Sequence, residues 1–137
     1  MIPSDTPSGR DNCGIVSVAM LAGLTYAETE RMFMDLFNKS DYTSIWDRME
    51  VIHLIGLTVL EEKHYKYKPT LKNWLTTTYD PAHDYHVSMT GHAVTIRQHL
   101  LFDQVFTSGV PALQSPFTRK RISAYIKLRG KKCFIEM

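Results

Sequence analysis

One cysteine stands where a polar segment gives way to a run of small and apolar residues. Cys13 follows Asp11 and Asn12, and residues 14–23 read GIVSVAMLAG. We expect Cys13 in the first turn of a helix, where backbone N–H groups without helical partners and the positive end of the helix dipole stabilise a thiolate. The thiolate is the nucleophilic form of cysteine. The sequence therefore predicts that Cys13 is an activated nucleophile.

A histidine and an acidic residue follow in the order that thiol catalysis needs. His92 opens the strand-like run 92–97, and Asp103 ends a second such run, 100–103. A nucleophilic thiol needs a base that accepts its proton, and that base needs a third group to orient its ring. We therefore expect His92 to act as general base and acid and Asp103 to orient it.

The loop between the two strand-like runs decides which residue faces the histidine. In an antiparallel hairpin with a two-residue loop, at 97–98 or at 98–99, strand alternation sends His92 and Asp103 to the same face. They are directly opposite in the first register and diagonal in the second. A three-residue loop would instead bring Gln104 opposite His92, so Gln104 is the alternative orienting residue.

Acyl transfer also needs donors for the oxyanion that forms during attack. The backbone N–H of Cys13 is a natural donor at a helix start, and a second donor from a side chain is usual. Asn12 and Ser8 are the nearest candidates, and their spacing favours neither.

A metal site is the competing interpretation of the histidines. His83, His86 and His92 lie near Asp80 and Asp84, but their spacing matches no closed ligand set. We therefore expect no metal and no cofactor.

The composition indicates an ordinary globular protein. With 137 residues, 44% of them hydrophobic and 22% charged, the chain is expected to form a single domain over residues 1–137, with residues 1–12 as an irregular arm. The longest apolar stretch, 15–24, is too short for a membrane span, and no signal peptide is visible. We expect a cytoplasmic protein with reduced thiols, in which Cys133 has a structural role.

The net charge of +2 is too small to indicate a nucleic-acid partner, although seven of the 16 lysines and arginines lie in the last 19 residues. This basic tail is interpreted as the solvated face of an edge hairpin rather than as a binding patch for an acidic partner or nucleic acid.

The elements that must position these residues are helices first and strands later. A helix over 13–22 ends at Gly23, and the next is capped by Thr25 with Glu28 in a capping box. Helices gathered before strands predict an α+β fold in which N-terminal helices pack on a C-terminal antiparallel sheet. The remaining expected elements are helices at 43–55 and, more weakly, 71–77, and strands at 57–61, 86–89, 92–97, 100–103, 122–128 and 133–136, the last two as a terminal hairpin.

Three segments carry a resemblance to a known family. "DNCGIVSVAMLAGLTYAE", followed by "GHAVTI" and "LLFDQ", resembles the papain-like cysteine peptidases of the bacteriocin-processing, double-glycine leader type. The resemblance implies a papain-like fold, a peptide or protein substrate, and a triad of Cys13, His92 and Asp103.

The chain departs from that family upstream of the cysteine. Members usually have a glutamine there as the oxyanion donor, whereas this chain has no glutamine before residue 98. Two hypotheses follow: a thiol hydrolase with another donor, or a catalytically inactive papain-like module that binds a protein or peptide. The order of the three residues also occurs in transglutaminase-like and amidase folds, so thiol acyl chemistry is better supported than peptide cleavage in particular.

Overall fold

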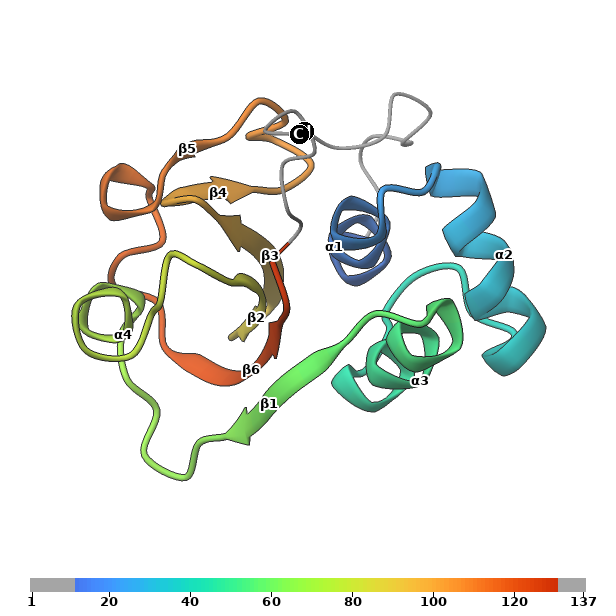
Figure 1. Ribbon diagram of the computed structural model, residues 1–137, viewed down its shortest axis with the longest axis horizontal. Coiled ribbons are helices and arrows are strands. Elements are labelled where there is room, and N and C mark those ends of the chain that lie inside the picture. Colours follow the sequence, from blue (N-terminus) through green and yellow to red (C-terminus); the bar gives the residue numbers. More distant parts are fainter. Residues whose placement is uncertain (1–11, 131–137) are drawn as a thin grey trace, which may run out of the picture.

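Helices and an antiparallel sheet make up the part of the chain that the computed structural model describes, residues 12–130 (Figure 1). The predicted α+β class is confirmed. The helices are α1 (Cys13–Ala22), α2 (Tyr26–Phe37), α3 (Ile45–Ile55), α4 (Leu71–Thr77) and the 3₁₀ turn η1 (Ala112–Gln114). The strands are β1 (Val59–His64), β2 (Asp84–Met89), β3 (His92–Arg97), β4 (Leu100–Phe102), β5 (Val110–Pro111) and β6 (Ile122–Leu128).

Capping residues set the helix ends. The capping box predicted for α2 is confirmed, since the Thr25 side chain accepts from the Glu28 N–H and Glu28 accepts from the Thr25 N–H. A second capping box, between Ser44 and Asp47, begins α3 at Ile45 rather than at residue 43. Because serine at an N-cap satisfies a backbone N–H inside the helix, it fixes the first turn.

The sheet has the strand order β1-β6-β2-β3-β4-β5, with every neighbouring pair antiparallel. Arg97 pairs with Leu100, so the loop between β3 and β4 is Gln98-His99. Both loop residues have positive φ, 50° and 69°, as a type I′ hairpin turn requires. This register makes His92 and Asp103 diagonal neighbours, and the three-residue loop is excluded.

The prediction of a terminal hairpin at the edge of the sheet, formed by residues 122–128 and 133–136, is wrong in one respect. β6 is an interior strand, paired with β1 along one side and with β2 along the other. Both of its backbone edges are therefore occupied, and β6 offers no edge to a following strand. The predicted partner strand at 133–136, which includes Cys133, lies outside the described residues.

Two apolar clusters cover the sheet. Helices α1, α2 and α3 form the first, where Phe33 and Val51 pack with Ile126 and Leu128 of β6. Helix α4 covers the second, with Trp74 at its centre, and Figure 1 shows the sheet between these two groups of helices. Helix α1 lies directly against β3 and β2 and is buried along nearly its whole length. No helix within residues 12–130 combines the length and apolar character of a membrane span.

A buried polar network joins α1 to the sheet. The Arg48 guanidinium lies 2.8 Å from His86 Nε2, and because arginine can only donate, that nitrogen must accept. His86 therefore carries its proton on Nδ1, which donates to Ser17 Oγ at 2.7 Å. Burial, and then the Arg48 charge, lower the pKa of His86 well below its usual value. The Ser17 hydroxyl in turn lies 2.7 Å from Thr95 Oγ1, so α1 is fixed to β3 as well.

Removing the hydroxyl of Ser17 is expected to destabilise the fold. Ser17→Ala leaves the buried N–H of His86 without an acceptor, which costs about 1–3 kcal/mol of unfolding free energy. Urea denaturation followed by circular dichroism measures the change. Ser108→Ala, at an exposed loop position, is the control, and equal stability of the two variants would contradict the role given to Ser17.

Candidate functional site

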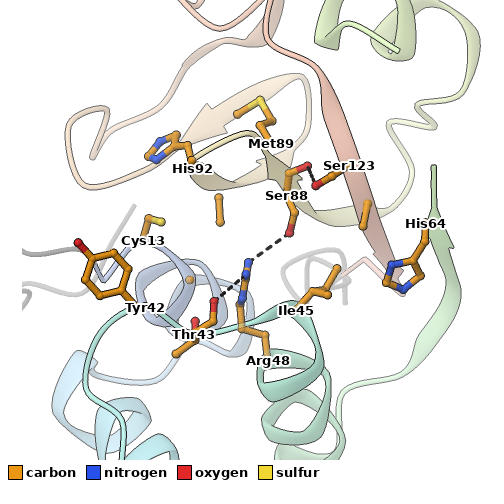
Figure 2. Close-up of a pocket in the computed structure, with 14 residues that line it drawn as sticks. Cys13, Tyr42, Thr43, Ile45, Arg48, His64, Ser88, Met89, His92 and Ser123 are labelled. Atoms are coloured by element: carbon orange, nitrogen blue, oxygen red, sulfur yellow. Dashed lines mark hydrogen bonds between the residues drawn. The ribbon is translucent and has the colours of Figure 1, made fainter. Parts of the chain in front are cut away.

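Two of the three residues predicted for thiol chemistry line one cavity, and the third lies buried behind the histidine. Cys13 is the first residue of α1 and His92 the first of β3, and both line a cavity of about 470 Å³ (Figure 2). His92 Nε2 lies 2.7 Å from Asp103 Oδ2, which leaves Nδ1 free of the carboxylate. The interaction between His92 and Cys13 lowers the pKa of the thiol and raises that of the imidazole.

The loop after β4 holds the Asp103 carboxylate in position. Asp103 Oδ1 accepts from the backbone N–H groups of Val105 at 2.9 Å and Phe106 at 2.7 Å. Its side chain is 1% exposed, whereas that of His92 is 19% exposed. Because Oδ1 is occupied by the loop, Oδ2 is directed at the imidazole, and the ring is held by a group that cannot rotate away.

An aromatic ring covers the imidazole. Phe117 packs on His92 with the ring centroids 5.0 Å apart, and Phe106 supports Phe117 edge-on at 6.1 Å. Excluding water from the pair strengthens the interaction between His92 and Asp103, because hydrogen bonds are electrostatically stronger in a low dielectric.

The pKa directions favour an ion pair. Burial by itself raises the pKa of Cys13, but the hydrogen bond and charge of His92, the Ala93 backbone and the Arg48 charge outweigh it, so the net pKa is lowered. For His92, burial acts downward, but hydrogen bonds to Asp103 and Cys13 raise its pKa to about 9. Burial acts upward on the pKa of Asp103, and its hydrogen bonds, first to His92, lower it overall. All three directions favour the charged forms: thiolate at Cys13, imidazolium at His92 and carboxylate at Asp103.

The two predicted amide candidates bond to each other instead. Gln104 Nε2 donates to Asn12 Oδ1 at 2.6 Å, and Asn12 Nδ2 donates to the Tyr26 hydroxyl at 3.2 Å. Neither amide lines the cavity. Asp103 therefore takes the position beside His92 for which Gln104 was the alternative, and Asn12 ties the start of α1 to the loop that carries Asp103. The other oxyanion candidate, Ser8, lies outside the described residues.

The cavity also contains a residue that the sequence analysis did not single out. The Arg48 side chain extends from α3 into the cavity wall and is directed between Thr43 and Ser88 (Figure 2). The sequence does hold a signal for it, because Arg48 occupies a position on the apolar stripe of α3 between Ile45 and Ile52. A cation at such a position is buried and needs polar partners.

The three histidines of the metal hypothesis each have different interaction partners. His83 is 3.5 Å from Asp80, His86 is enclosed between Ser17 and Arg48, and the third, His92, belongs to the site above. Across residues 12–130 no three His, Cys, Asp or Glu side chains gather as a metal ion would require.

No known protein family, curated protein or solved structure matches this chain. What the site does is therefore inferred from its residues. A thiolate beside an imidazolium can attack an electrophilic carbon and can then supply a proton to the leaving group.

The His92 titration distinguishes the two orienting candidates. Asp103→Asn removes the carboxylate, so the pKa of His92 is expected to fall from about 9 toward its usual value, whereas Gln104→Ala leaves the carboxylate in place and should change it little. An NMR pH titration of the His92 ring protons measures both. A larger shift in the glutamine variant would reverse the assignment.

Proposed function

We propose that this protein is a thiol hydrolase that cleaves a peptide or amide bond through Cys13, His92 and Asp103. The observation that carries the proposal is that Cys13 and His92 line one cavity, large enough for a substrate segment, with the His92 ring bonded to the buried Asp103 carboxylate. The resemblance of the three sequence segments to papain-like, bacteriocin-processing peptidases supports the same residues in the same roles.

The first half-reaction would form an acyl-enzyme. The Cys13 thiolate attacks the carbonyl carbon, a C–S bond forms, and the carbonyl electron pair moves to the oxygen. When the tetrahedral intermediate collapses, the C–N bond breaks and the amine leaves with the proton that His92 Nδ1 donates. Asp103 keeps the ring oriented throughout and stabilises its charged form.

The second half-reaction would release the acid. Neutral His92 takes a proton from water, the resulting hydroxide equivalent attacks the thioester carbon, and the C–S bond breaks. The Cys13 thiolate is regenerated beside a protonated imidazole, which is the resting state. Donors for the oxyanion include the backbone N–H groups at the start of α1, which have no carbonyl partner within the helix.

One observation favours a second function, that of a catalytically inactive module that binds a protein or peptide. Among the described residues that line the cavity there is no side-chain amide beside Cys13 to serve as a second oxyanion donor. Loss of one such donor lowers catalysis by about 10²–10³-fold in serine hydrolases. A module of this kind would keep the cavity and bind a segment without cleaving it.

Thiol reactivity tests whether Cys13 is activated. At pH 7 iodoacetamide is expected to label Cys13 much faster than Cys133, the second thiol of the chain, because Cys13 has the lowered pKa. His92→Ala removes the hydrogen bond and the positive charge beside the sulfur, so labelling of Cys13 should slow by about tenfold or more for each unit by which its pKa rises. Peptide mass spectrometry gives both rates. Equal and slow labelling of the two thiols in the unchanged protein would argue against an activated site.

Turnover separates the enzyme from the binding module. Incubation with a proteome-derived peptide library is expected to give cleaved peptides and, after acid quenching, an acyl adduct on Cys13. Both should disappear in Cys13→Ala and persist in the matched variant Cys133→Ser. Peptide capture that survives Cys13→Ala, with neither cleavage nor adduct in the unchanged protein, would support the module instead.

A further inference from the structure

A buried arginine shares the cavity with the thiol. Arg48 is 8% exposed, and it lines the same cavity as Cys13 (Figure 2). Its Nε donates to the Ser44 carbonyl at 3.1 Å, Nη2 to the Thr43 carbonyl at 3.0 Å, and Nη1 to His86 and Ser88. Four hydrogen bonds therefore fix the guanidinium in one orientation.

The glycine after the cysteine lets this arginine lie against the first turn of α1. A Cβ at Gly14 would stand 2.4 Å from Thr43 Oγ1, 2.8 Å from Arg48 Cδ and 2.9 Å from Arg48 Nε. All three distances are too short for a real side chain. Gly14 is therefore required for the close approach of Thr43 and of the Arg48 side chain to the first turn of α1, beside Cys13.

The hydrogen-bond acceptors of Arg48 are all neutral. They are two backbone carbonyls, the Ser88 hydroxyl and His86, whose pKa is too low for it to be charged at neutral pH. A buried cation is costly unless an opposite charge compensates it. The positive end of the α1 dipole lies at the same place and adds to that cost.

Few negative groups are near enough to compensate this charge. Burial disfavours the Arg48 cation, and two anions oppose that effect on its pKa: first the Cys13 thiolate and then the Asp47 carboxylate. Asp47 is itself paired with Lys39 at 2.8 Å, and Asp103 is paired with His92. The Cys13 sulfur is therefore the first negative partner of Arg48, and it interacts with two cations, more strongly with His92 and then with Arg48.

We propose that Arg48 is a positioning residue whose fixed positive charge holds the Cys13 sulfur in its ionised, nucleophilic form. The inference deepens the proposed function and rests on it for its biological meaning. With Arg48 included, the site has two negative groups, Cys13 and Asp103, and two positive ones, His92 and Arg48. All four can then be charged together in a partly buried cavity.

The pH dependence of Cys13 alkylation tests this role without a substrate. Arg48→Gln removes the charge, and the midpoint of the iodoacetamide rate profile is expected to rise by about one pH unit, with a rate about tenfold lower at pH values below the midpoint. Arg48→Lys loses the same fork of hydrogen bonds but keeps the charge, so its midpoint should stay near that of the unchanged protein. If Arg48 had a merely structural role, both substitutions would shift the midpoint by the same amount, and that result would overturn the proposal.

Arg97→Gln is the matched control. Arg97 is also a partly buried arginine, ion-paired with Asp84 at 2.8 Å, and it does not line this cavity. Its removal should leave the midpoint unchanged. A midpoint that moves as far in Arg97→Gln as in Arg48→Gln would show a general effect of charge or stability and would also overturn the proposal.

Gly14→Ala serves if Arg48→Gln does not fold. Alanine suits a helix, every charge is retained, and the added Cβ displaces Arg48 from the first turn. The midpoint should rise here too, and an unchanged midpoint would contradict the proposal. These titrations are independent of turnover: a raised midpoint with no hydrolysis in any variant would support Arg48 and refute the hydrolase, whereas hydrolysis with an unmoved midpoint would do the reverse.

Discussion

The contact between α1 and β3 is the constraint on which the site depends. Cys13 begins one of these elements and His92 the other, so the separation of sulfur and ring is set by how the helix lies on the strand. Apolar surfaces alone would let a helix slide by fractions of a turn. The bonds of Ser17 to His86 and Thr95 have fixed directions and lengths, and they allow one arrangement only.

The same network links the site to its surroundings. His86 lies between Ser17 of α1 and Arg48 of α3, so the helix that carries the thiol, the sheet that carries the imidazole and the helix that carries the arginine share one set of hydrogen bonds. At the N-cap of α1, Asn12 and Gln104 join the helix start to the loop of Asp103. The two sets of bonds thus hold α1 both at its N-cap and one turn further along, at Ser17.

The sequence predicted what depends on neighbours along the chain. Helix caps at Thr25 and Gly23 are local, and so is the alternation that sends His92 and Asp103 to one face for either two-residue loop. It could not predict what depends on distant partners. To predict that β6 is an interior strand, one must know that it pairs with both β1 and β2. To predict the contacts of Arg48, one must know that His86 and Ser88 face the same stripe of α3.

The interior place of β6 has a consequence for how the protein is made. A nascent chain emerging from the ribosome would present the helices, β1 and the β2–β3–β4 meander before residues 122–128 exist, and until then β1 and β2 have no strand between them. The late insertion of β6 pairs residues that are far apart in sequence, and such pairing is slow compared with the closure of a local hairpin. Because β6 also contributes Ser123 and Ala124 to the cavity wall, the thiol would be synthesised first and enclosed last.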